Sequence, residues 1–176
     1  MKKQLLVLGF LCAATQQLYG LTDKQVLQGI VSNHTRALDR RNMYERPLDS
    51  GDLHGWNQAI IDVKEFVERN SKKNKKQLMR YFNEIQNANN DLINGIKSAY
   101  AQVIGGGVDE DVRKQFGKKF TTIDTHMKRI QKNLDWVATK SEVENQAIKL
   151  LGTLARFVGV TARKAGNNLN IMVMGG

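Results

Sequence analysis

The chain has 176 residues with 41% hydrophobic and 25% charged residues, which suffices for one domain with its own core and argues against wholesale disorder. A single proline and few β-branched runs argue against an all-β fold. Lysine and arginine number 27 against 17 acidic residues, and the resulting net charge of +10 favours anionic partners.

Residues 1–20 have the pattern of a secretory signal peptide. Lys2 and Lys3 form a basic start, residues 5–14 form a short apolar run, and a polar stretch ends at Gly20. We expect cleavage after Gly20, with cleavage after Ala14 as the alternative. An uncleaved membrane anchor is the rival reading, but the run is shorter than the ~20 residues that span a bilayer. The segment predicts an exported protein, periplasmic or secreted, with no transmembrane segment in the mature chain.

The only cysteine, Cys12, lies within this segment. Cleavage would therefore leave a mature chain without a disulfide, a thiolate metal ligand or a cysteine nucleophile.

A first helix is predicted from about Asp23 to Met43. Residues 22–25 have the form of a capping box, and apolar residues follow at helical spacing. Residues 47–51 then form a loop that contains the only proline. Asn33 begins a glycosylation sequon, which we interpret as a chance match.

A second helical run begins near Asp52, becomes polar over residues 70–76, and resumes until the glycines of a predicted hairpin turn, Gly105, Gly106 and Gly107. Its apolar positions step by three and four, as in helices that pack at small crossing angles. They are Leu53, Trp56, Ile60, Val63 and Val67, then Leu78, Phe82, Ile85, Leu92, Ile96, Ala99 and Val103, with Asn89 at one core position.

A third run mirrors the second. The acidic residues 109–111 suit the positive end of a helix dipole, and residues 139–142 form a second polar gap. Ser141 and Glu144 form a capping-box pattern, and residues 166–168 are a natural helix stop before an apolar, glycine-ended tail at 167–176. The apolar positions are Phe116, Phe120, Ile123, Met127, Ile130, Leu134 and Val137, then Ile148, Leu151, Ala155, Val158 and Ala162.

The two polar gaps lie at nearly equal distances from Gly106, so they would face each other in an antiparallel hairpin. A straight arm would be roughly 75–80 Å long, far beyond a typical helix, and a lone pair of helices buries little surface. We therefore expect both arms to break at the gaps and fold back, although an unbroken register keeps the straight hairpin as an alternative. The predicted fold is an all-α antiparallel bundle of four or five helices, with one domain at residues 21–166.

Catalytic and metal-binding patterns are weak. His34, His54 and His126 form no helical metal-ligand pair, no serine-nucleophile elbow is present, and the triple glycine lacks the lysine of a phosphate-binding loop. We therefore expect no cofactor and no enzymatic activity, with an enzyme of unrecognised type only as a third reading.

The basic residues are the strongest functional indication. They predict binding to lipid head groups or polysaccharide, whereas the simpler explanation is a solvated helix face. We do not expect nucleic acid, because the protein is predicted to be exported and aromatic residues are not interleaved with the basic cluster. The candidate residues are Arg69, Lys72, Lys73, Lys75, Lys76, Arg80, Lys118, Lys119, Lys128, Arg129 and Lys132.

The apolar last helix fits either a bundle core or a membrane interface, and we favour the core. The sequence thus predicts a binding or scaffolding protein that acts through its basic surface or through protein contacts, including self-association. A membrane-active amphipathic protein is the second reading.

Overall fold

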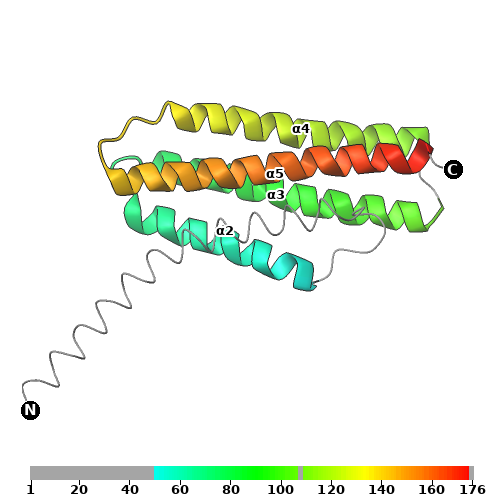
Figure 1. Ribbon diagram of the computed structural model, residues 1–176, viewed down its shortest axis with the longest axis horizontal. Helices are drawn as coiled ribbons and strands as arrows, with labels where there is room; N and C mark the ends of the chain where they lie inside the picture. The colour runs from blue at the N-terminus through cyan, green and yellow to red at the C-terminus, as the bar shows by residue number, and fades with distance from the viewer. Residues whose placement is uncertain (1–49, 107–108, 175–176) are drawn as a thin grey trace, which may run out of the picture.

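The computed structural model describes residues 50–106 and 109–174, and every regular element in these ranges is an α-helix (Figure 1). The expected all-α bundle is confirmed for this part of the chain. The expected signal peptide, the helix from Asp23 to Met43 and Gly107 lie outside the described residues. The helices are α2 (Ser50–Asn70), α3 (Lys75–Ile104), α4 (Glu110–Asp135) and α5 (Glu142–Met174).

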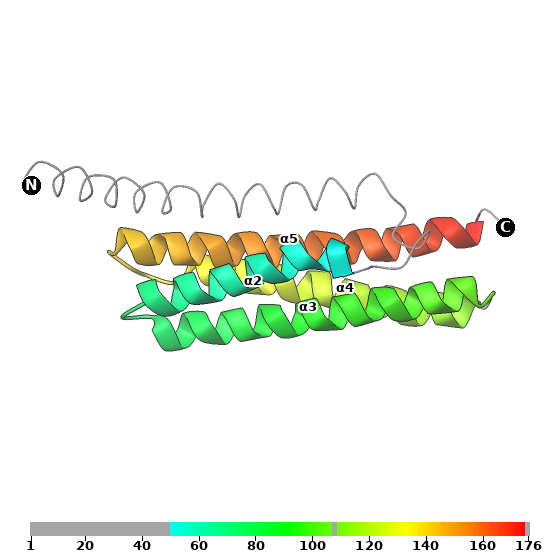
Figure 2. The same cartoon turned by 90° about the horizontal axis from the view of Figure 1, so that it is seen from below.

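The helices lie side by side and nearly parallel to one long axis in both views (Figures 1 and 2). Helix α5 contacts each of the other three, and its most extensive contact is with α4. The chain leaves helical structure near both predicted gaps, at residues 71–74 and 136–141. The arms therefore fold back as expected, and the straight-hairpin alternative is wrong. The two breaks lie at the same end of the bundle, which we call the loop end.

The glycine turn joins α3 to α4 at the opposite end. Helix α3 ends at Ile104, Gly105 donates its N–H to the Ala101 carbonyl, and Gly106 has a φ of +74°, a conformation that glycine adopts without strain. Asp109 then caps α4, because its side chain accepts a 2.8 Å hydrogen bond from the Val112 N–H. The predicted stop and acidic restart are both confirmed.

The three-and-four apolar pattern forms the core. Burying each large side chain contributes ~1.5–3 kcal/mol relative to leaving it in water. Five residues of the predicted pattern are only partly buried: Leu53, Val103, Phe116, Val137 and Ile148. The buried seam residues are Trp56, Ile60, Val63 and Val67 from α2; Leu78, Phe82, Ile85, Leu92, Ile96 and Ala99 from α3; Phe120, Ile123, Met127, Ile130 and Leu134 from α4; and Leu151, Ala155, Val158 and Ala162 from α5.

The predicted helix stop at residues 166–168 is wrong, since α5 continues to Met174 and the expected tail begins inside it. The cause is tertiary packing: Leu169 is only 1% exposed, and Gly166 lies against Phe120 of α4. Glycine costs about 1 kcal/mol in a helix relative to alanine, less than burial of Leu169 returns.

Helix α5 approaches α4 closely at a glycine that the apolar pattern did not single out. A Cβ atom at Gly159 would lie 3.0 Å from the Met127 Cβ and 3.2 Å from an Asp124 carboxylate oxygen. Gly152, Gly159 and Gly166 recur every seven residues, the spacing that returns to one helix face. The absent side chain at Gly159 therefore sets how near the two helices can lie.

Candidate anionic-surface binding site

Glu144 holds the two loops of the loop end together. Its side chain is buried, and it accepts hydrogen bonds from Thr139 Oγ1 at 2.6 Å and from the N–H and side-chain amide of Asn74 at 3.0 and 3.1 Å. The Thr139 hydrogen bond is the main cause that lowers the Glu144 pKa; burial opposes it, and the Asn74 bonds and the Lys73 charge assist it. The carboxylate therefore stays ionised and fixes one loop relative to the other.

The predicted capping box at the start of α5 forms only in part. Ser141 Oγ accepts a 3.3 Å hydrogen bond from the Glu144 N–H, as an N-cap side chain does. The reciprocal bond is absent in the described structure, because the Glu144 carboxylate reaches to Asn74 instead of returning to Ser141.

A groove of about 640 Å³ opens between the two loops. Four cationic residues line it, Arg69, Lys72 and Lys73 from one side and Lys140 from the other. The only carboxylate in its lining is Glu144, which is already hydrogen-bonded. The groove is therefore a concave surface with excess positive charge.

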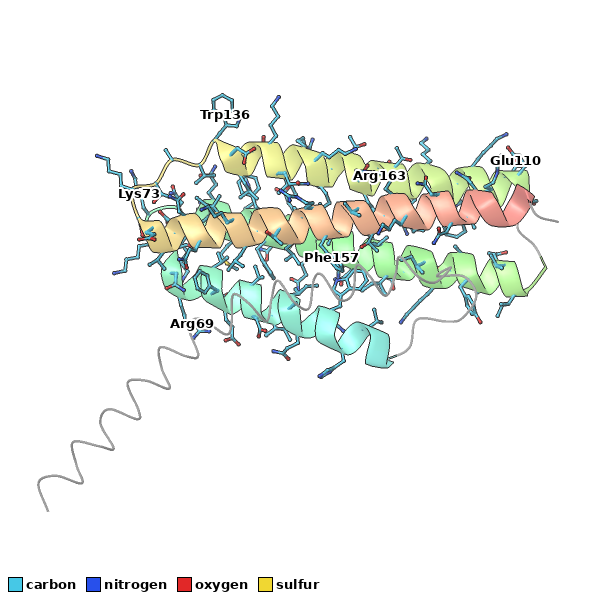
Figure 3. All side chains as sticks on the ribbon, viewed as in Figure 1. Arg69, Lys73, Glu110, Trp136, Phe157 and Arg163 are labelled. Atoms are coloured by element: carbon cyan, nitrogen blue, oxygen red, sulfur yellow. The ribbon has the colours of Figure 1, made fainter. Side chains whose placement is uncertain are left out.

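The loop end collects five of the predicted site residues, and all five are exposed: Arg69, Lys72, Lys73, Lys75 and Lys76. Arg69 pairs with Glu65 on its own helix at 3.0 Å. The four lysines form no ion pair with a carboxylate in the described ranges. Figure 3 shows Lys73 at this end of the bundle and Glu110 at the other.

The remaining predicted residues differ from these in position or in pairing. Lys118 and Lys119 lie on α4 about 24–26 Å along the helix from its end at the loops. Lys128 pairs with Asp124 at 2.8 Å, and Arg80 lies 3.8 Å from Glu84. Arg129 and Lys132 are exposed on the last turns of α4, nearer the loop end.

We did not predict two residues of this surface, Trp136 and Lys140. The Trp136 side chain is 80% exposed at the C-cap of α4, and Figure 3 shows it pointing away from the bundle. The signal was present in the sequence: Leu134 and Val137 occupy the seam, which leaves the intervening indole off the core face.

A second polar cluster ties helices together away from the groove. Asp124 accepts two hydrogen bonds from Arg163 of α5, at 3.0 and 3.1 Å, and one from Lys128. Burial tends to raise the Asp124 pKa, but the hydrogen bonds from Arg163 and Lys128 outweigh it and hold the pKa below its ordinary value. His126 lies 3.1 Å from Glu84, so it bridges α4 and α3. These contacts therefore have a structural role, because they join α4 to α5 and to α3.

Four large apolar side chains of α5, Leu151, Leu154, Phe157 and Val158, are each at most 5% exposed, which confirms the core interpretation of this helix. No helix within the described residues is long and apolar enough to span a bilayer. The same residues contain no group of three or more His, Cys, Asp and Glu side chains placed to hold a metal ion. Comparison of the chain with known proteins gave no match to a family model, to a curated protein or to a solved structure.

Proposed function

We propose that this protein is an exported, non-enzymatic bundle that binds anionic surfaces through its loop end. The observation that carries the proposal is the unpaired positive charge there. Lys72, Lys73, Lys75 and Lys76 gather beside the groove and have no ion-pair partner among the described carboxylates. A lysine without a carboxylate beside it contributes more to the external field than an ion-paired lysine, whose field the carboxylate offsets.

Several exposed cations elsewhere on the bundle are paired with a carboxylate on their own helix. Lys64 faces Glu68, Arg80 faces Glu84, and Lys114 faces Glu110, each one helical turn away. Such pairs are the ordinary pattern of a solvated helix face. Other exposed lysines, such as Lys97, Lys118 and Lys119, also form no ion pair with a described carboxylate, so the loop end differs in its density of charge: four unpaired lysines lie within residues 72–76, and Lys72 and Lys73 line a groove. This concentration favours a binding surface over a merely solvated one.

The loop end is also pre-organised. The Glu144 carboxylate ties Asn74 to Thr139, so Lys73 and Lys140 are presented by loops in a fixed relation. A surface that is ordered before it binds loses less conformational entropy on association.

The test compares two double neutralisations of equal charge. Lys72→Gln with Lys73→Gln alters the loop end, whereas Lys118→Gln with Lys119→Gln removes the same charge from the middle of the bundle. We expect the full-length protein to bind dextran sulfate resin and anionic vesicles, and the first variant to elute at clearly lower salt than the second. Equal losses would show that binding follows net charge alone and would contradict the assignment.

Protein contact is the other route by which this surface could act. A pull-down from the exporting cell that recovers a partner sensitive to Lys73→Gln, with no retention on either anionic support, would replace the anionic surface by a protein.

A further inference from the structure

We propose that the loop end docks on an anionic lipid bilayer, with the Trp136 indole entering the head-group region. This inference rests on the proposed function and names its ligand. The occupant is a lipid surface, and soluble polyanions and proteins are alternative outcomes of the test.

Trp136 is the first observation. The Trp136 indole is 80% exposed, so it contributes little to the stability of the fold. It nevertheless stands at the C-cap of α4, where Figure 3 shows it projecting from the bundle. Indole rings prefer the boundary between water and hydrocarbon, because they combine an apolar body with an N–H donor. Val143, 44% exposed, adds apolar surface where α5 begins.

The charges around the indole are the second observation. Arg129, Lys132 and Trp136 are spaced by three and four residues, so they share one face at the end of α4, and all three are exposed. Lys140 follows in the next loop. Each lysine or arginine near an anionic membrane improves binding by a factor of roughly five, and these act together with the lysines of the groove.

Acidic residues reduce this charge without reversing it. Asp135 and Glu142 are exposed beside the same loop, whereas Glu144 is buried and hydrogen-bonded to Asn74. The exposed cations at the loop end still outnumber the exposed carboxylates.

A bilayer fits these observations better than a polyanionic chain does. A soluble polyanion would pair with the lysines and leave Trp136 in water, whereas a bilayer accommodates the charge and the indole together. Docking of this kind leaves the α5 core residues, such as Phe157, in place. Because the core stays intact, we expect reversible attachment to vesicles without leakage of their contents.

The experiment uses the full-length chain and two vesicle types: phosphatidylcholine alone, and phosphatidylcholine with about one third phosphatidylglycerol. In a Trp56→Phe variant Trp136 is the only tryptophan, and we expect its emission to shift to the blue and to be quenched by brominated lipid on the anionic vesicles alone. The difference between the wild-type and Trp136→Phe spectra gives the same readout if Trp56→Phe does not fold.

The matched pair is Trp136→Ser and Ile104→Ser, since Ile104 is 66% exposed at the opposite end of the bundle. We expect Trp136→Ser to weaken partitioning onto anionic vesicles roughly tenfold, the factor equivalent to about 1.4 kcal/mol. We expect Ile104→Ser to have little effect.

Several results would overturn the inference. They are an unchanged emission of Trp136, equal binding by the two serine variants, and equal binding to neutral and anionic vesicles. The last of these is the result that attachment through the apolar run at residues 5–14 would give. Retention on dextran sulfate without vesicle binding would reject the bilayer but leave the proposed function standing. Failure on both anionic supports would reject both.

Discussion

The Glu144 carboxylate accepts hydrogen bonds from both the backbone N–H and the side-chain amide of Asn74, at 3.0 and 3.1 Å. Asn74 lies in the connection between α2 and α3 and Glu144 in the first turn of α5, so the bonds bring together the two points where the hairpin arms break. Because Glu144 is buried, these bonds are formed away from competing water, where loss of a partner is most costly.

We predict that Glu144→Gln lowers the free energy of unfolding by about 1–3 kcal/mol, because the amide cannot accept all three hydrogen bonds that the carboxylate receives. The corresponding fall in melting temperature is roughly 2–4 °C per kcal/mol. Glu142→Gln is the control, since Glu142 is exposed on the same turn. Equal melting temperatures for the two variants would contradict the role of Glu144.

We predict a loss of stability in acid that depends on Asp124. Its pKa is lowered in the folded protein, so its contribution is present above the unfolded value near pH 4 and is lost as the pH falls through the folded value. Asp124→Asn should therefore be less stable than wild type at pH 7, by about 1–2 kcal/mol, with a smaller difference at pH 2–3. Urea unfolding at both pH values measures this, and a difference independent of pH would refute it.

The sequence predicted the helices and their seams because apolar periodicity is a local signal. The steps from Phe120 to Leu134 and the break at residues 139–142 can be read directly, and so can the turn at Gly106. The stop at residues 166–168 failed because Leu169 is buried by packing that no local pattern records. The Gly159 contact depends on the distance between α4 and α5, which the sequence does not express.

The site was predicted in part for the same reason. Lys72 to Lys76 form a basic run in the sequence. The polar gaps around Lys73 and Lys140 lie at nearly equal distances on either side of Gly106, which indicated that the two segments would face each other. Lys118 and Lys119 look equally basic, but only the structure shows that they lie far from the groove. Trp136 was missed although the seam positions Leu134 and Val137 place its side chain off the core face.

Phe120→Asp tests the core assignment. Phe120 is 1% exposed and lies against Gly95 of α3 and Gly166 of α5, so an aspartate there would be an unpaired buried charge. The cost is several kcal/mol, comparable to the whole stability of a small domain, and circular dichroism should show an unfolded or partly folded chain. Phe116→Asp, at the half-buried neighbour, should retain its helices. Retention of cooperative melting in Phe120→Asp would show that the seam is wrong.

Gly159→Ala and Gly152→Ala test whether close approach explains the glycines of α5. At Gly159 a methyl group would lie 3.0 Å from the Met127 Cβ, an atom fixed to the α4 backbone, so α4 and α5 would have to separate. That strain costs about 1–3 kcal/mol, against a gain of up to about 1 kcal/mol from the helix propensity of alanine. At Gly152 the new methyl group would meet no atom of another helix within 4 Å, so only the gain remains. We therefore expect Gly152→Ala to raise the melting temperature and Gly159→Ala to lower it. If both substitutions stabilise the protein, the two helices have room at Gly159, and the glycine does not set their separation.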